Sequence, residues 1–197
     1  MLAVAATGAA GGTSSTALSV REYPVPAGSR PHDVAPARDG GVWYTAQGSG
    51  ELGWLDPKTG RTRAAGRHGR AASSGYANLN TAVFDRRGLL WFTGQSGIYG
   101  RLDPKTGAMR VFRAPLGTGP YGITTTPKGR VFYASLAGSH IAEINVRTGK
   151  VTVIRPPTPG QGARRVWSDS KGRIWVSEWN AGQVGLYDPA AGAWREW

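Results

Sequence analysis

Short apolar runs recur along the chain, and a polar turn precedes each of them. The runs VWYT, LLWFT, RVFYA and RIWVS combine β-branched and aromatic residues, a composition typical of strands. Each follows a turn that contains glycine, at 39–40, 87–88, 128–129 and 171–172, as expected between paired strands. No segment shows sustained helical periodicity. The pattern therefore predicts an all-β chain of short antiparallel strands.

Two landmarks repeat along the sequence with a common period. The aromatic anchors lie 48, 41 and 43 residues apart, at Trp43, Trp91, Phe132 and Trp175. The turn residues lie 47, 42 and 43 apart, at Asp56, Asp103, Asn145 and Asp188. A period of about 42 residues with four strands per unit is typical of β-propeller blades. The sequence predicts a β-propeller of four-stranded antiparallel blades, with about four blades present.

The repeats also define an expected domain organisation. Residues 1–19 read as a flexible tail or the remnant of an export signal, and residues 20–197 as propeller repeats, with blades at about 31–64, 78–115, 120–157 and 163–197. Val20–Val25 matches the outer strand of other repeats, whereas Arg61–Ser74 resembles a linker or a frayed strand. Either the copies are part of a larger ring, or they form a four-bladed ring with an orphan strand. Open sheet edges would permit self-association.

Composition and charge narrow the classes of function. The chain has no cysteine, which excludes disulfides, thiolate zinc sites and cysteine nucleophiles. The net charge of +12 raises the question of an anionic partner. However, the basic residues are scattered and form no stripe interleaved with aromatics, so we expect no nucleic-acid partner. No run is long enough to span a bilayer, and the compartment stays open between cytoplasm and export.

Candidate chemistry lies at the entrance to the inner strands, where propeller loops line a central funnel. In the four repeats this position holds His32, Asn80, Tyr121 and Arg164, which we expect to converge on one face. His32 is the best candidate for a general base, because imidazole exchanges protons near neutral pH. His68 and His140 are expected to be solvated and structural, respectively.

Elimination leaves two acidic residues for a metal site. The other aspartates and glutamates fall in hairpin turns, in outer strands or near third strands, whereas Asp33 follows His32 and Glu178 follows an aromatic strand. Two carboxylates without a histidine at metal-ligand spacing suit a hydrated hard cation such as Mg²⁺ better than zinc.

The repeats resemble those of the streptogramin B lyase family, also called virginiamycin B lyases. The resemblance rests on PYGITTTPKGRVFYAS, LLWFTGQSGIYGRLDP and IWVSEWNAGQVGLYDP and covers about residues 20–197. It implies a seven-bladed propeller and a Mg²⁺-dependent lyase that gives antibiotic resistance by linearising a cyclic depsipeptide. In such enzymes a histidine is the base and glutamates hold the metal. The ring opens by elimination across the ester rather than by hydrolysis.

Carried over residue by residue, the resemblance implies roles for several side chains. SRPHDV places His32 at a substrate-contacting histidine, and SEWNAGQVG places Glu178 at a metal ligand with Trp179 beside it. Tyr121, Arg164, Asn80 and Trp179 are then expected to bind a cyclic peptide or ester. Arg164 stands where the fourth repeat would carry a histidine, and the family's Glu-Pro-His segment has no counterpart. The alternative is therefore a non-catalytic binding or scaffold propeller.

Overall fold

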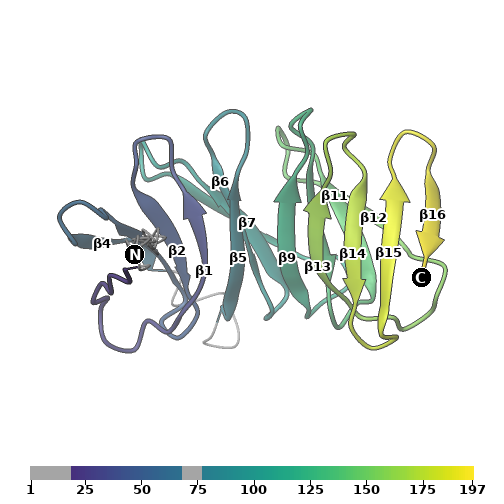
Figure 1. The fold of residues 1–197 in the computed structure, drawn as a ribbon, viewed down its shortest axis with the longest axis horizontal. Helices are drawn as coiled ribbons and strands as arrows, with labels where there is room; N and C mark the ends of the chain where they lie inside the picture. The colour runs from purple at the N-terminus through teal and green to yellow at the C-terminus, as the bar shows by residue number, and fades with distance from the viewer. Residues whose placement is uncertain (1–18, 68–76) are drawn as a thin grey trace, which may run out of the picture.

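The computed structural model describes residues 19–67 and 77–197, and every regular element within them is a β-strand (Figure 1). The strands form four antiparallel sheets, and in each sheet the strands lie in chain order. The first two blades are made of β1 (Pro31–Pro36), β2 (Val42–Ala46), β3 (Glu51–Leu55) and β4 (Thr62–Arg67), and of β5 (Leu79–Phe84), β6 (Leu90–Gly94), β7 (Ile98–Leu102) and β8 (Met109–Arg113). The third and fourth are made of β9 (Pro120–Thr125), β10 (Val131–Ser135), β11 (His140–Ile144) and β12 (Val151–Ile154), and of β13 (Ala163–Ser168), β14 (Ile174–Glu178), β15 (Gln183–Asp188) and β16 (Ala193–Glu196). The predicted all-β fold of four-stranded blades is confirmed.

The hydrophobic core lies between the blades rather than within one sheet. Successive aromatic residues of β6 point to opposite faces, so that Phe92 packs toward the first blade and Trp91 toward the third. In β10, Tyr133 and Phe132 divide between the second and fourth blades in the same way. All four side chains are fully buried. The alternation predicted for the aromatic strands therefore joins each blade to both of its neighbours.

The turn between the third and fourth strands explains why the Asp-Pro-Lys-Thr-Gly sequence recurs. The Oδ1 atoms of Asp56 and Asp103 each accept a hydrogen bond of 2.9 Å from the backbone N–H two residues later. The glycines that end these turns, Gly60 and Gly107, have φ of 74° and 73°, a conformation that other residues adopt at a cost. The aspartate and the glycine together fix the hairpin that leads to the outer strand.

The inner strands β1, β5, β9 and β13 follow one another along the molecule, each in contact with the next (Figure 1). Each inner strand has a register irregularity near its start, between Pro31 and Val34 in β1 and between Leu79 and Ala82 in β5. In β9 and β13 it lies at the same repeat position, at residues 120–123 and 163–165. A bulge changes the direction of the side chains that it carries. The first residues of all four inner strands therefore depart from the regular alternation of side chains between the two faces of a sheet.

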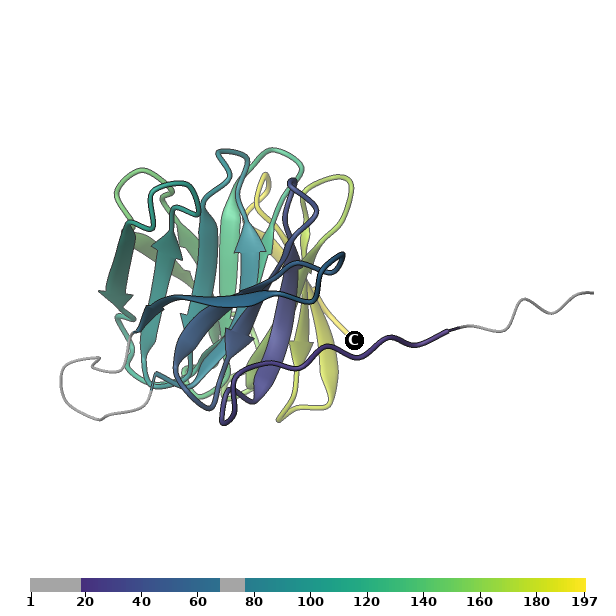
Figure 2. The same cartoon turned by 90° about the vertical axis from the view of Figure 1, so that its left-hand side faces the viewer.

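Two segments at the first blade, Val20–Val25 and the described part of Arg61–Ser74, differ from the structure expected for them. Val20–Val25 is not a strand, although it is an extended segment that runs beside the first blade (Figure 2). Pro24 and Pro26 remove two backbone N–H donors that a paired strand would need. Conversely, the Arg/Ala-rich stretch does form an outer strand, β4, which pairs with β3 from Leu55–Thr62 to Glu51–Arg67 with a register irregularity between Glu51 and Leu52. The expected tail at 1–18, His68 and the remainder of Arg61–Ser74 lie outside the described residues.

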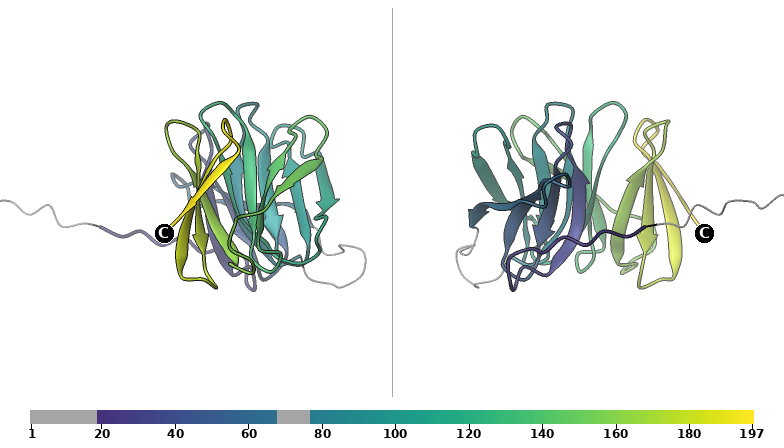
Figure 3. Two further views of the ribbon diagram at one scale, coloured as in Figure 1. Left: turned by 90° about the vertical axis from the view of Figure 1, so that its right-hand side faces the viewer. Right: turned by 60° about the vertical axis from the view of Figure 1, so that its left-hand side comes forward.

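At the other end, β16 forms the outer edge of the fourth blade (Figure 3). The backbone of Trp197 continues the pairing, with hydrogen bonds of 2.9 and 3.0 Å to Val184. Among the described residues, no helix is long and apolar enough to cross a bilayer.

Candidate functional site

The four residues at the funnel entrance lie at the inner-strand bulges. His32 in β1, Asn80 in β5 and Tyr121 in β9 fall within the irregular register positions, as does Arg164 in β13. The structure brings three of the four side chains, those of His32, Tyr121 and Arg164, into direct contact. The hydrogen bonds below describe that cluster, which we call the funnel cluster (His32, Tyr121, Arg164 and Trp179).

His32 is held by two hydrogen bonds in the funnel cluster. Its Nδ1 lies 3.2 Å from the carbonyl oxygen of Asn80, and its Nε2 lies 3.2 Å from the hydroxyl of Tyr121. A carbonyl oxygen only accepts, so Nδ1 carries the hydrogen and donates. In the neutral ring Nε2 is then the acceptor, and Tyr121 donates to it. The basic nitrogen of His32 therefore faces Tyr121, the residue that belongs to the third blade.

Arg164 continues this chain of hydrogen bonds. Its guanidinium donates to the Tyr121 hydroxyl at 3.2 Å and lies over the Tyr121 ring, 5.0 Å from the centroid. It also lies 4.3 Å from the ring centroid of Trp179. Trp179 is 63% exposed, which leaves one large aromatic surface open to a ligand. Cation–π contacts of this kind hold the guanidinium in place while its remaining donors stay available.

Asn80 takes part through its backbone rather than its side chain. Its carbonyl accepts hydrogen bonds from Thr45 Oγ1 at 2.5 Å and from His32. Its side-chain amide is buried and donates to the Asn78 carbonyl at 2.9 Å. The side chain of Asn80 therefore supports the bulge, and the structure does not bring it together with the exposed groups of the funnel cluster.

A second layer of polar residues lies one position further along each inner strand. Asp33 and Thr81 occupy this position in the first two blades, and Arg165 occupies it in the fourth. The Arg165 guanidinium donates to Asp33 Oδ2 at 2.5 Å and to Thr81 Oγ1 at 3.3 Å. Through its bond to Asp33, Arg165 connects the fourth blade to the first. Gly122 stands at this position in the third blade, where a Cβ would lie 2.8 Å from the Cα of Arg165.

Arg165 is a site residue that the sequence reasoning missed. The signal was available in the repeat alignment: the position after the funnel residue carries Asp33 in one blade and Arg165 in another. Opposite charges at equivalent positions of converging strands are placed to pair. The sequence could not show which blades face one another closely enough for the pair to form.

Glu178 lies at the end of β14 and is buried, with 1% of its surface exposed. Neither carboxylate oxygen has a hydrogen-bond partner. Burial, reinforced by the negative charge of Glu196, raises the pKa of Glu178 to about 7. Its Oε1 lies against Gly185 of the paired strand, where a Cβ would be only 2.5 Å away. The carboxyl group is therefore inside the fourth blade.

Asp33 and Glu178 do not fit a shared magnesium site in this arrangement. Asp33 is neutralised by Arg165, whose positive charge would repel a cation. Glu178 is enclosed, whereas Mg²⁺ usually keeps several waters. Within 19–67 and 77–197, no three histidine, aspartate or glutamate side chains form a group that could hold a metal ion. Among the described residues, the buried oxygens of Glu178, Gln161 and Gln183 lack a hydrogen-bond partner.

His140 has the structural position expected for it. It begins β11, is 1% exposed, and its Nδ1 donates to the Gly138 carbonyl at 3.0 Å. Burial lowers the pKa of this histidine, so the neutral ring is favoured. His140 packs edge-on against Tyr133, with ring centroids 6.1 Å apart.

Comparison with known proteins identifies the family. The model of the virginiamycin B lyase family matches residues 19–194, nearly the whole chain. The chain belongs to the virginiamycin B lyase family. None of the curated proteins matches the sequence.

Solved structures of the virginiamycin B lyase family share the fold. The selenomethionine form of virginiamycin B lyase from Staphylococcus aureus superposes with a TM-score of 0.78 at 22% identity, covering 90% of this chain and 58% of that one. A streptogramin B lyase gives 0.78 at 24% identity, covering 90% and 57%. A catalytically inactive histidine-to-alanine variant of the S. aureus enzyme, solved with quinupristin, gives 0.77 at 22% identity, covering 90% and 58%. The chain thus spans somewhat more than half the length of these proteins.

Proposed function

We propose that the funnel cluster binds a cyclic depsipeptide of the streptogramin B type and opens its ring by elimination at the ester. Family membership supports the substrate class, because related structures carry the names streptogramin B lyase and virginiamycin B lyase, and one holds quinupristin. The observation that carries the proposal is the orientation of His32. Its Nδ1–H is bound to a backbone carbonyl, so Nε2 is the basic atom, and the substrate C–H would take the place of the Tyr121 hydroxyl that donates to Nε2 in this structure.

In this proposal His32 is the general base. Nε2 takes the proton from the carbon next to the one that carries the ester oxygen, the C–H electron pair becomes the new C=C bond, and the C–O bond breaks. The ester leaves as a carboxylate on the opened chain. Arg164 is placed to stabilise that negative charge, because it is held by Tyr121 and Trp179 and retains free donors. No step of the proposed reaction runs through Mg²⁺, since the arrangement of Asp33 and Glu178 does not fit that ion.

The test is incubation of the whole chain with quinupristin, with and without added Mg²⁺. Elimination gives a ring-opened product of unchanged mass, whereas hydrolysis adds one water, so chromatography with tandem mass spectrometry separates the two reactions. We expect elimination, and we expect His32→Ala to abolish it. Lys171→Ala, an exposed substitution in a hairpin turn of the fourth blade, is the control and should keep full activity. Unaltered turnover in His32→Ala would remove His32 from the reaction.

The second candidate is a non-catalytic propeller that binds the same class of ligand. The Arg165–Asp33 ion pair favours it, because Asp33, one of the two carboxylates expected to hold a metal, is already paired with a cation. Calorimetry with quinupristin separates the two candidates. Binding without turnover, weakened about tenfold or more by Trp179→Ala through loss of the exposed aromatic surface, would support the binding protein. Failure to bind at all would contradict both.

A further inference from the structure

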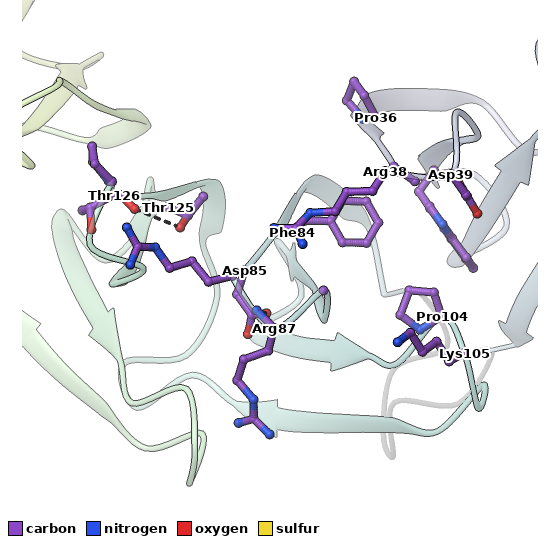
Figure 4. A pocket seen from close by; sticks show the side chains of 15 residues that line it. Pro36, Arg38, Asp39, Phe84, Asp85, Arg87, Pro104, Lys105, Thr125 and Thr126 are labelled. Atoms are coloured by element: carbon purple, nitrogen blue, oxygen red, sulfur yellow. Dashed lines mark hydrogen bonds between the residues drawn. The ribbon is translucent and has the colours of Figure 1, made fainter.

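A cavity lies at the far end of the inner strands from the funnel cluster. His32 is near the start of β1, whereas this cavity begins at Pro36, the last residue of β1. It has a volume of about 580 Å³ and is formed by the first three blades (Figure 4). A cavity of this size accommodates a small molecule. We call it the turn-face cavity, because hairpin turns of the first two blades and the loop after β9 surround it.

The floor and walls of the turn-face cavity provide apolar surface. Trp43 and Phe84 belong to the cluster that joins the first and second blades, where Trp43 is buried and Phe84 partly buried. Three prolines extend this surface, at Pro36, Pro104 and Pro127. Aromatic and proline rings favour contact with a flat apolar ligand rather than a strongly hydrated one.

The rim of the cavity carries an excess of positive charge. It includes four basic side chains and two carboxylates, those of Arg38, Arg86, Arg87, Lys105, Asp39 and Asp85. Within the part of the chain that the structure describes, none of the four basic side chains forms an ion pair with a carboxylate. Their charge is therefore available to a ligand.

The two carboxylates of the rim accept hydrogen bonds from backbone N–H groups and from an indole. Asp85 Oδ1 accepts from the backbone N–H of Arg87 and of Leu89, at 2.9 and 3.0 Å, and its Oδ2 accepts from Trp91 Nε1 at 2.9 Å. Asp39 Oδ1 accepts from the backbone N–H of Gly41 at 2.9 Å. Both oxygens of Asp85 and one oxygen of Asp39 are therefore engaged within the turns.

The positive field extends along the second blade next to the cavity. The pKa of Arg101 is lowered, first by burial and then by the charges of Arg110 and Arg87. Asp85 acts in the opposite direction, so Arg87 belongs to a group of like charges that one carboxylate compensates only in part. An anion bound near Arg87 would relieve this repulsion.

We propose that the turn-face cavity binds a small aromatic carboxylate. The apolar walls would contact its ring, and the arginines of the rim would bind its carboxylate, for which the planar guanidinium fork is well suited. This site is independent of the proposed lyase or binding function, because it lies at the other end of β1 and uses none of the residues of the funnel cluster.

The experiment is a titration of the whole, nitrogen-labelled chain with naphthoate, compared with neutral naphthamide of the same shape. We expect naphthoate to shift the backbone amide signals of Arg87, Gly88 and Thr126 saturably, and increased salt to weaken the binding. Naphthamide should bind at least tenfold more weakly. Equal binding of the two compounds, or shifts confined to the funnel cluster, would overturn the proposal.

Charge-reversal variants give the matched test. Arg86→Glu should raise the Kd for naphthoate at least tenfold, whereas Arg195→Glu, an exposed residue of β16 with the same change in net charge, should leave it unchanged. Equal weakening by both variants would show a response to net charge alone and would contradict a built site. If Arg86→Glu fails to fold, the naphthoate–naphthamide comparison on the unaltered chain still decides the matter.

Discussion

Residues at equivalent positions of the repeat make different contacts in the funnel. His32 and Arg164 occupy equivalent positions, but one is a ring fixed by a carbonyl and the other a cation held over two aromatic rings. Asp33 and Glu178, both expected as metal ligands, differ even more. One forms an ion pair at 2.5 Å, and the other is enclosed without a partner. Residue type alone therefore does not decide chemical role in this family of blades.

Replacement of Glu178 by glutamine should change how stability depends on pH. Because the folded-state pKa of Glu178 is raised to about 7 from 4.5, the folded chain binds this proton more tightly than the unfolded chain does. Unfolding free energy should thus fall as pH rises from about 4.5 to 7 and then level off. The shift corresponds to roughly 3 kcal/mol. Glu178→Gln should remove most of this loss and be the more stable protein at pH 8.

Denaturant unfolding of both proteins at pH 5 and pH 8 measures this effect, with the difference between them isolating Glu178 from the other titrating groups. Glu143→Gln, which removes a partly exposed carboxylate paired with Arg130 at 2.6 Å, is the control and should not stabilise at pH 8. Parallel pH curves for Glu178→Gln and the unaltered chain would contradict the prediction.

The Arg165–Asp33 ion pair should stabilise the arrangement of the first and fourth blades modestly. Both side chains are partly exposed, at 34% and 24%, so solvent screens their attraction. A double-mutant cycle with Arg165→Met and Asp33→Asn should give a coupling of roughly 1 kcal/mol in unfolding free energy. The local pair Arg173–Asp169, within one turn of the fourth blade, provides a comparison cycle. A coupling of zero between Arg165 and Asp33 would mean that the two blades do not depend on this contact.

At the scale of the strands, glycine in the third strand makes room for an aromatic residue in the second. Gly53 is paired with Tyr44 and Gly100 with Phe92, and in each case a Cβ on the glycine would collide with the ring. The rings cover the glycines, and the ring of Phe92 also packs between the first and second blades. The high glycine content therefore has a second cause besides the turns, because some strand positions have no room for a side chain.

Gly100→Val should therefore destabilise the second blade. Its Cβ would lie 2.4 Å from Phe92 Cζ and 2.8 Å from the Arg110 carbonyl oxygen, so both the buried ring and the outer strand must shift. Overpacking of this kind costs about 1–3 kcal/mol, measurable by denaturant unfolding. Gly107→Asn in the adjacent turn has no atom within 4 Å of its Cβ and keeps a residue type that tolerates positive φ, so it should cost less than about 1 kcal/mol. Equal losses in the two variants would contradict the packing argument.

At the scale of the whole molecule, the two faces of the fourth blade differ. One packs on the third blade through Val166, Ile174 and Val176. The other carries exposed Trp167 and Trp197, at 55% and 61%, with Trp197 stacked on Trp175 at 6.0 Å. Exposed aromatic surface on a sheet face is favourable to association.

We expect the chain to self-associate through this face at high concentration. The Trp167→Lys, Trp197→Lys double variant should shift sedimentation toward monomer, because it places charge on both exposed aromatic positions. The double variant Arg110→Ala, Arg147→Ala, which changes exposed residues of the second and third blades, is the control. Association that persists unchanged in the tryptophan variant would place the contact elsewhere.

The sequence by itself determined the repeat, and the repeat determined the blade. Alternating aromatic strands and Asp-to-Gly turns specify their local structure through period-two burial and positive φ, so the four sheets were predictable from neighbouring residues alone. The repeat in the sequence also places His32, Tyr121 and Arg164 at equivalent positions near the start of the inner strands. Val20–Val25 shows the limit, because strand-like composition does not supply a pairing partner.

Only the tertiary structure decided which of these groups meet and what surrounds them. The bond from Arg165 to Asp33 joins residues 132 positions apart, and the burial of Glu178 depends on how β14, β15 and β16 close over its carboxyl group. Burial and charge pairing between blades are properties of the assembled sheets, and they set the pKa and availability of each side chain. The turn-face cavity is of the same kind, since three blades must come together before its apolar walls and unpaired arginines form one site.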